Sequence, residues 1–489
     1  MNESPLALRY LIFFIAVNTL PFNDVAHAAE MPGGYDHSRP NTPINQNTSL
    51  VRLKSFESSA YTIANLPPLP SSALNQQPLV STNPVQLDAP LNIGISRQIA
   101  SPSILLSQLQ WKETGNNVRI ALLKLRSAEA KALRLHLFLA HSAQSPPQSD
   151  QISLRFKGSD EQDFEDNGKT FAQSNGGWSA VISGDVMTIE IAIQPTLHPE
   201  QWRLYFPELS HLFISPADSD EEIQRILPKD FNLSCEQDVS CFTEQSTAFN
   251  NIRTSVARMI FTEKGNSYLC TGTLLDNENT PKRALFWTAA HCIHSKEVAR
   301  NLITYWFYEA DACQSRTINT HFVALDGGAR LLYTNQKRDT SLLELKKNPP
   351  QNAFFAGWTS DAILMENTSV LGIHHPKGTL KKYAQGYLTR LLTQVNDKQW
   401  FYGVIWDKGQ IDFGSSGSGL FTLDQKGHYL LRGGLYAAKF PQCTLSAESE
   451  VFYSRFSDVF PVIKKFLLPS LSPRYAPSTT APSAASKQR

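Results

Sequence analysis

The segment Phe286-Trp287-Thr288-Ala289-Ala290-His291-Cys292 decides the fold class. Its apolar first half predicts a β-strand, and the small residues that follow predict where that strand ends. The strand end would present the imidazole of His291, and a disulfide at Cys292 would hold it in place. A lone histidine is most often a structural residue whose hydrogen bonds are satisfied. The segment therefore indicates catalysis only together with other segments that supply an acid and a nucleophile.

Two further segments supply such groups. Arg338-Asp339-Thr340-Ser341-Leu342-Leu343-Glu344-Leu345 places an acid directly before an apolar strand, and Phe413-Gly414-Ser415-Ser416-Gly417-Ser418-Gly419-Leu420-Phe421 places serines among glycines. A serine hydroxyl needs a base to act as a nucleophile and N–H donors to hold the oxyanion. The small residues allow a tight turn that aims the Gly414 and Ser416 amides at one point. Taken alone, Asp339 would be a solvated surface residue and the Gly/Ser run a linker, but strand patterns flank that run closely.

The order His291, Asp339, Ser416 links the three segments. It is the order of the chymotrypsin-type triad, and it differs from the orders in subtilisin and the α/β-hydrolases. The spacings suit His and Asp in a first barrel and Ser in a second. Residues 235–468 read as short strands, and a helical apolar spacing follows over 456–467. We therefore expect an all-β fold of two antiparallel β-barrels with a short C-terminal helix.

These segments resemble the trypsin-like serine peptidases, and most of all their bacterial lysyl endopeptidase branch. The resemblance covers about 235–460, and residues 103–230 have a looser likeness to the β-rich propeptide of such enzymes. Its motifs are TAAHC (288–292), DTSLLEL (339–345), GSSGSG (414–419), CTGTLL (270–275), AGW (356–358) and IHHP (373–376).

The resemblance implies a role for each site residue. Ser416 would be the acylated nucleophile, and His291 the base and then the acid. Asp339 would hold the imidazole, and the Gly414 and Ser416 amides would form the oxyanion hole. The implied disulfides are Cys235–Cys443, Cys241–Cys313 and Cys270–Cys292. By itself an even number of cysteines favours disulfides without fixing their pairing, and the absence of CxxC spacing disfavours metal binding.

The pocket for the residue before the scissile bond departs from the family pattern. The residues expected to line it are Gln410, Ala437, Ala438 and Val451. Lysine-specific members carry an aspartate where this chain has Val451, and an apolar side chain cannot compensate a buried ammonium. We therefore expect small or medium uncharged side chains before the cut. Lysine or arginine held by Glu450 or Asp412 is the alternative, although Glu450 should face the other side of its strand.

Two other positions bear on activation and on metals. Ser415 stands where the animal trypsin-like pattern has an aspartate that pairs with a freshly cut N-terminus, so activation should not depend on such a pair. Release of the N-terminal domain could still be required. His374 and His375 are adjacent, and neighbouring strand residues point to opposite faces. We expect neither a metal nor another cofactor.

Length and composition set the remaining expectations. The 489 residues exceed one ordinary domain, and the net charge of +1 gives no case for nucleic acid. A short apolar run at 10–17 before Ala26-His27-Ala28 predicts a cleaved secretory signal, with a membrane anchor as the alternative. The expected division is a signal peptide (1–28), a Pro/Ser-rich linker (29–102), a β-sandwich-like, propeptide-like domain (103–230), the protease domain (231–468) and a disordered tail (469–489).

The sequence thus predicts a secreted or periplasmic serine endopeptidase that is made as a precursor and acts on proteins or peptides. We expect a monomer, with no membrane attachment of the mature form. The rival class is a catalytically silent protease fold used for binding or adhesion, which usually loses a triad member. An esterase is disfavoured because Ser418 stands where the nucleophile elbow G-x-S-x-G requires its last glycine.

Overall fold

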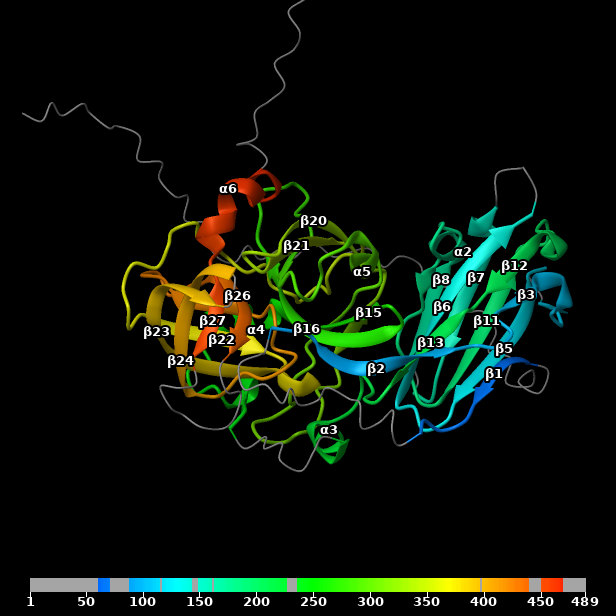
Figure 1. Ribbon diagram of the computed structural model, residues 1–489, viewed down its shortest axis with the longest axis horizontal. Helices are drawn as coiled ribbons and strands as arrows, with labels where there is room; N and C mark the ends of the chain where they lie inside the picture. Colours follow the sequence, from blue (N-terminus) through cyan, green and yellow to red (C-terminus); the bar gives the residue numbers. More distant parts are fainter. Residues whose placement is uncertain are drawn as a thin grey trace, which may run out of the picture.

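The computed structural model describes residues 60–70, 88–114, 117–142, 148–160, 162–226, 235–395, 398–438 and 450–468. The expected signal peptide and tail lie outside these ranges. Three β-rich bodies stand side by side in Figure 1: a two-layered N-terminal unit on the right, a curled sheet in the middle and a barrel on the left. The expected all-β class with two barrel-like halves is confirmed.

The N-terminal unit is a sandwich of two sheets. One layer has the order β1 (Tyr61–Leu66), β5 (Arg119–Ser127), β11 (Val186–Ile193), β7 (Ile152–Lys157), β8 (Asp163–Asn167), and β4 (Lys112–Glu113) pairs with β5. The other has the order β2 (Leu91–Gln98), β13 (Glu208–Leu212), β6 (Ala132–His141), β12 (Trp202–Tyr205), β3 (Ser103–Leu105), and β9 (Gly177–Trp178) and β10 (Ile182–Ser183) pair with β6. Strand β7 alternates buried and half-buried residues, as a strand with one face on a core must.

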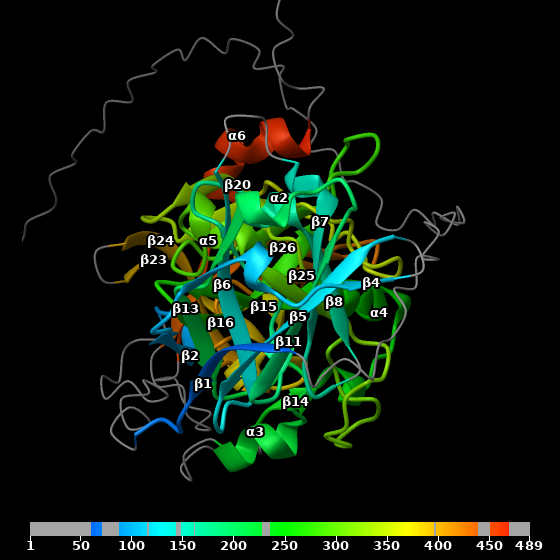
Figure 2. The same ribbon diagram turned by 90° about the vertical axis from the view of Figure 1, so that its right-hand side faces the viewer.

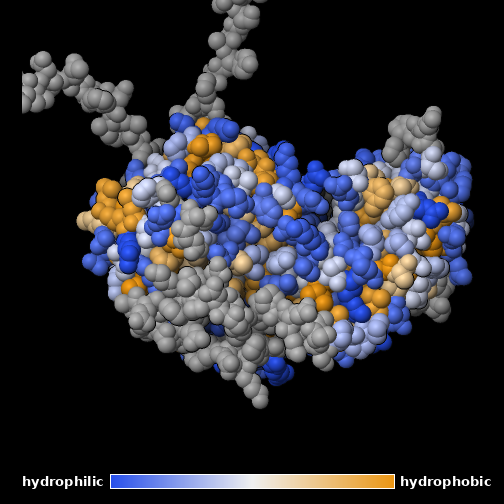
Figure 3. Space-filling model, in the orientation of Figure 1, coloured by the Kyte–Doolittle hydropathy of each residue, from blue (hydrophilic) through white to orange (hydrophobic). Residues whose placement is uncertain are grey.

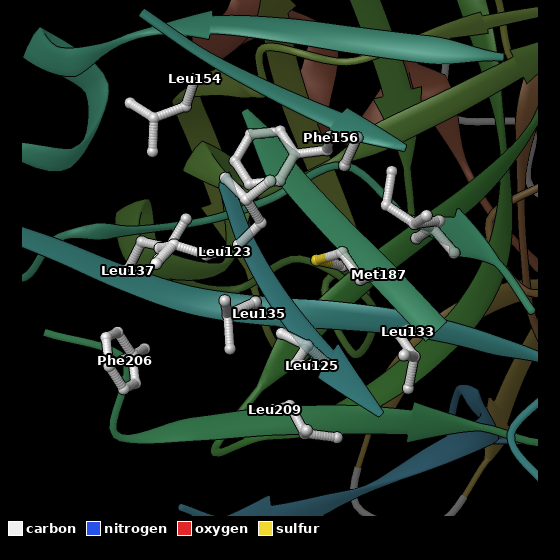
Figure 4. Packing of buried hydrophobic residues seen from close by; sticks show 14 of the residues in the cluster. Leu123, Leu125, Leu133, Leu135, Leu137, Leu154, Phe156, Met187, Phe206 and Leu209 are labelled. Atoms are coloured by element: carbon white, nitrogen blue, oxygen red, sulfur yellow. The ribbon is translucent and has the colours of Figure 1, made fainter. Parts of the chain in front are cut away.

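The sandwich core is made of aliphatic and aromatic side chains from both layers. Leu123 and Leu125 from β5 meet Leu135 from β6, with Phe156 and Met187 beside them, and all five are fully buried (Figure 4). This close-packed cluster continues into the middle body, where it includes Ile260, Leu269 and Tyr305.

The expected linker is wrong for two of its segments. Residues 61–66 form β1, which pairs in parallel with β5, and residues 91–98 form β2, which pairs with β13. The Pro/Ser-rich composition of the surrounding sequence concealed them. Their apolar side chains are few, but Leu91 and Ile93 are buried in the sandwich core.

Strand β2 also joins the sandwich to the middle body. It pairs antiparallel with β16 (Asn266–Leu275), so that one sheet of 14 strands runs through both units. Arg134 of the sandwich adds a buried polar contact. Its Nε donates to Ser179 O at 2.7 Å, while Nη1 donates to Thr262 Oγ1 at 2.9 Å. The two units therefore share backbone and side-chain hydrogen bonds.

The middle body is the first half of the protease unit. Its sheet curls through β19 (Val323–Leu325), β18 (Ile303–Trp306), β15 (Val256–Glu263), β16, β17 (Leu285–Thr288), β21 (Thr340–Leu345) and β20 (Ala329–Asn335). The short helix α5 (Lys296–Arg300) packs against β20 and β15. Since β17 pairs with both β16 and β21, the strand that precedes His291 lies at the centre of this curl.

The left body is a closed antiparallel barrel. Six strands form a ring in which the last pairs with the first: β22 (Ser369–His374), β23 (Lys382–Val395), β24 (Lys398–Lys408), β27 (Val451–Ser454), β26 (Tyr429–Ala438) and β25 (Gly419–Leu423). A ring leaves no free edge among these strands. Strand β14 (Gln237–Asp238) pairs with β23 from outside the ring.

The helices are few and short. The C-terminal helix α6 (Phe456–Leu467) has the predicted bounds, and it buries Val459, Ile463 and Leu467. Helix α3 (Asp220–Ile226) follows the sandwich, and α4 (Thr247–Thr254) precedes β15 with Ser246 as its N-cap. Both lie beside the two protease halves in the views of Figures 1 and 2.

Two of the three expected disulfides lie within the described residues, and both are present: Cys241–Cys313 and Cys270–Cys292. The third expected pairing involves Cys443, which lies outside them. No described helix combines the length and the apolar character needed to cross a bilayer. Figure 3 shows a mostly hydrophilic face with small hydrophobic groups.

Candidate active site

His291 and Asp339 lie in two turns that the sheet brings together. His291 follows β17, and Asp339 stands between β20 and β21 in the left-handed region, with φ of 45°. Because Thr288 pairs with Ser341, both turns open at the same end of the sheet. The sequence expectation that a strand end would present His291 is met.

The carboxylate of Asp339 holds His291 at two points. The His291 backbone N–H donates to Oδ1 at 2.9 Å, and the ring Nδ1 lies 2.8 Å from Oδ2. The Asp339 side chain is fully buried. A carboxylate beside Nδ1 favours the tautomer that carries its proton there, which leaves Nε2 as the basic nitrogen.

The turn that carries Ser416 packs directly against the strand end that carries His291. Thr271 of β16 donates its N–H to Ser416 O at 2.9 Å, and its hydroxyl donates to Gly414 O at 2.9 Å. A Cβ at Gly417 would lie 2.3 Å from Thr288 Oγ1 and 2.7 Å from Ala289 N, and φ there is 82°. Glycine is therefore required for the Ser416 turn to reach the His291 strand.

His291 Nε2 is buried and has no hydrogen-bond partner among the described residues. Ser416 is also almost fully buried, and no hydrogen bond joins its hydroxyl to Nε2 in this described state. Catalytic hydrogen bonds are often long in the absence of substrate and tighten in the complex. The sulfur atoms of Cys270 and Cys292 lie within 4.8 Å of a His291 nitrogen, but they form a disulfide and offer no thiolate for a metal.

The Ser416 turn leaves two backbone amides uncommitted. Ser415 N–H donates to Asp412 O at 3.0 Å, and Gly417 N–H donates to Leu435 O at 2.9 Å. The amides of Gly414 and Ser416 have no acceptor in the part of the chain that the structure describes. Gly414 has φ of 90°, and a Cβ there would lie 2.8 Å from His375 O, so this position also requires glycine.

Two further residues, Lys398 and Tyr436, lie near the proposed triad. Lys398 Nζ lies 3.6 Å from Asp339 Oδ1 and 4.3 Å from the centre of the Tyr436 ring. The Tyr436 ring in turn lies 6.4 Å from the imidazole of His291. Lys398 belongs to no recognisable motif, whereas Tyr436 directly precedes the expected pocket residues Ala437 and Ala438. The closure of the second barrel brings both to the site.

The structure brings two of the four expected pocket residues into one cluster. Val451 pairs with Ala438 across β27 and β26, and both are buried in one apolar cluster. Ala437 is buried in the neighbouring cluster, and Gln410 is half-buried in the segment after β24.

The alternative prediction is that Glu450 or Asp412 holds a basic side chain of the substrate, but both carboxylates have partners within the protein. Glu450 accepts from Arg390 Nε at 2.9 Å and from Thr389 Oγ1 at 3.0 Å. Asp412 lies 3.0 Å from Lys377 Nζ, and burial raises its pKa. Neither carboxylate is left unpaired to receive a lysine or arginine of the substrate.

Comparisons with known proteins give one consistent picture. A model described as "Lysyl endopeptidase N-terminal domain" matches residues 65–213, and one described as "Lysyl endopeptidase, C-terminal domain" matches residues 232–453. The chain is 38% identical over 388 residues to a lysyl endopeptidase of Pseudomonas aeruginosa, which covers 78% of this chain and 82% of that protein.

Two solved structures are similar over less than half of the chain. The HtrA-type protease AlgW with a tripeptide has 16% identity and a TM-score of 0.31, covering 45% of this chain and 62% of its own, which is less than two thirds. The thermostable serine protease AL20 from an extremophilic microorganism has 14% identity and a TM-score of 0.30, covering 42% of this chain and 92% of its own.

Proposed function

The chain belongs to the lysyl endopeptidase family, and we propose that it is a secreted serine endopeptidase that uses Ser416, His291 and Asp339 as its catalytic triad. The observation that carries the proposal is the two-point attachment of His291 to the buried Asp339, with Nε2 beside the Ser416 turn and without a partner among the described residues. This arrangement supplies a base in the tautomer that serine activation needs.

The first half of the reaction acylates Ser416. Its hydroxyl oxygen attacks the carbonyl carbon of the scissile bond while its proton passes to His291 Nε2. The tetrahedral intermediate collapses by breaking the C–N bond, and the imidazolium gives that proton to the leaving amine. Asp339 stabilises the imidazolium and stays ionised throughout.

The second half releases the acyl group. A water molecule gives a proton to His291 Nε2 and attacks the ester carbonyl, and the second tetrahedral intermediate breaks the bond to Ser416 Oγ as the serine regains its proton. In both halves the Gly414 and Ser416 amides are the N–H donors for the oxyanion. Their lack of other acceptors among the described residues supports this role.

The residue before the scissile bond is proposed to be small or medium and uncharged. Val451, Ala437 and Ala438 offer only apolar atoms, and Glu450 and Asp412 already have basic partners. Burying an ammonium against such a wall without a counter-charge would be unfavourable. This preference would set the chain apart from the activity named for its Pseudomonas relative.

The N-terminal sandwich is proposed to be the pro-domain of a precursor. It docks on the protease half through the β2–β16 pairing, and residues 214–231 separate the regions matched by the two family models. Lys229 in that segment, outside the described residues, is the proposed processing point. We propose that the domains are the sandwich, over 103–230 together with β1 and β2, and the protease domain, over 231–468.

A mixed peptide library tests the proposal. The protein recovered from the culture medium is incubated with the library beside Ser416→Ala, and the cut sites are read by mass spectrometry. We expect cuts that vanish in the variant, mainly after uncharged residues of small or medium size. Cuts only after lysine would overturn the pocket assignment, whereas no cuts by folded protein would favour a catalytically silent binding module.

A further inference from the structure

The serine before the nucleophile has a buried partner of its own. Ser415 Oγ lies 2.9 Å from His374 Nδ1, and it accepts a hydrogen bond from Asp412 N–H at 3.2 Å. His374 and Ser415 are both fully buried. Neither residue takes part in the bond-making steps proposed above, so this contact has no role in the chemistry itself.

His374 reaches the turn because of the barrel register. It is the last residue of β22, and β22 pairs with β25, which begins immediately after the turn. Gly372 stands opposite Leu420, so continuing the register carries His374 back along the turn towards Ser415. The barrel therefore presents this imidazole to the nucleophile turn in a fixed position.

The imidazole is held neutral by its surroundings. Burial lowers the pKa of His374 to about 3, and the nearby Lys382 acts in the same direction. A neutral ring can exchange one hydrogen bond with a hydroxyl at Nδ1. Nε2 has no partner among the described residues, so the bond to Ser415 is the one that His374 makes there.

Other contacts hold the backbone of the turn, and Ser415 itself exchanges hydrogen bonds with Asp412. Thr271 binds the carbonyls of Gly414 and Ser416, and Lys377 pairs with Asp412. These contacts fix the two ends of the turn and the carbonyl side of its peptides. The Ser415 hydroxyl, next to the nucleophile, has two contacts: the Asp412 N–H and the imidazole of His374, which is its side-chain partner.

We propose that His374 is a positioning residue, which holds Ser415 and thereby sets the Ser416 hydroxyl and the Gly414 and Ser416 amides in their reactive geometry. The proposal rests on the proposed function of Ser416. All the residues involved lie in the protease half, so the turn would be ordered without an ion pair from a new N-terminus. His374 would act on the rate of acylation and leave substrate binding nearly unchanged.

The test measures acylation chemistry in the full secreted chain. We would compare wild type, His374→Ala, His374→Asn, Ser415→Ala and the double variant, using diisopropyl fluorophosphate as the probe of Ser416 and a peptide cut in the library for kcat and KM. Asparagine places a polar atom near the position of Nδ1 and should restore much of the bond. The matched control is His211→Ala, which removes a buried histidine bonded to Ser127 Oγ at 2.8 Å in the sandwich.

We expect His374→Ala to lower kcat and the phosphorylation rate by about 10- to 100-fold, as loss of a buried hydrogen bond would, with KM within about twofold. His374→Asn should recover most of that rate. The double variant should be no slower than the slower single variant, because both remove one interaction.

Two outcomes would overturn the proposal. One is a lower unfolding temperature for His374→Ala with kcat unchanged, as expected for His211→Ala. The other is an equal loss in His374→Ala and His374→Asn while both retain the wild-type circular dichroism spectrum. Failure of wild type itself to react would instead reject the proposed function, so the two failures are distinguishable.

Discussion

The sandwich and the protease half each bury a histidine against a serine hydroxyl, and the two settings differ. In the sandwich, His211 of β13 binds Ser127 of β5, so the bond links strands already held by backbone ladders. In the protease half, His374 binds Ser415 in a turn without such a ladder. The same interaction therefore adds to backbone ladders in one place, whereas in the other we propose that it positions a catalytic turn.

The largest expected effect would come from Asp339, the aspartate of the proposed triad. Asp339→Asn should lower kcat by about 10⁴-fold, because the amide favours the wrong imidazole tautomer, while the fold is kept. The matched control in the sandwich is Asp185→Asn, whose carboxylate pairs with the exposed Arg126 at 2.9 Å. Steady-state kinetics on both variants would decide, and a loss below tenfold for Asp339→Asn would contradict the triad.

A smaller effect is expected at the junction of the two regions. Arg134→Met should destabilise the chain by about 3 kcal/mol, because Ser179 O, Thr262 Oγ1 and Asn301 O would lose a buried partner. Calorimetry should then show the sandwich unfolding at a lower temperature. Arg126→Met, at an exposed pair, should change little. Equal melting curves for the two variants would indicate that the buried contact does not join the regions.

The burial of His211 and His374 also predicts a dependence of stability on pH. Burial lowers the pKa of His211 to about 4 and that of His374 to about 3, whereas an unfolded histidine titrates near 6.5. The unfolded chain therefore binds more protons below pH 6.5. The contribution of each histidine is complete above that pH and is lost as the pH falls towards its folded-state pKa, by up to about 1.4 kcal/mol per pH unit.

Urea titrations from pH 7 to pH 4.5 measure this dependence. His211→Ala should reduce the dependence of the free energy of unfolding on pH by the contribution of one histidine, while leaving kcat at pH 8 unchanged. An unaltered slope in that variant would show that His211 is not held neutral in the folded chain.

The smallest expected effect concerns Lys398. Its ammonium, 3.6 Å from Asp339, weakens the attraction of that carboxylate for the imidazolium of His291. Lys398→Met should therefore shift the acid limb of the kcat/KM profile to higher pH, by about half a unit after solvent screening. Lys398→Arg should keep the wild-type profile. A shift to lower pH in Lys398→Met would mean that Lys398 acts in another way.

The sequence predicted the parts of this molecule that depend on local pattern. The strand before His291, the acid before β21, the glycine-rich turn and the helix over 456–467 all follow from periodicity and small residues. The all-β class followed from the short strand patterns, and the two disulfides followed from the resemblance. The left-handed turn that places Asp339 beside His291 depends on the pairing of β17 with β21, which the local sequence pattern does not show.

The parts that sequence reasoning missed depend on contacts between distant segments. Strands β1 and β2 lie in a Pro/Ser-rich stretch whose composition favours a linker, and only pairing with β5, β13 and β16 makes them strands. Lys398 comes to Asp339 through the β23–β24 hairpin. His374 belongs to the IHHP motif, but a motif does not show which hydroxyl an imidazole will meet.

The most direct test of the central claim is the site of covalent modification by diisopropyl fluorophosphate. The secreted chain is treated with the reagent, digested and mapped by mass spectrometry, with His291→Ala treated in parallel. We predict one modified residue, Ser416, in the wild type and a rate at least 10³-fold lower in His291→Ala, because the hydroxyl then lacks its base. Modification of another residue, or equal rates in both proteins, would contradict the account.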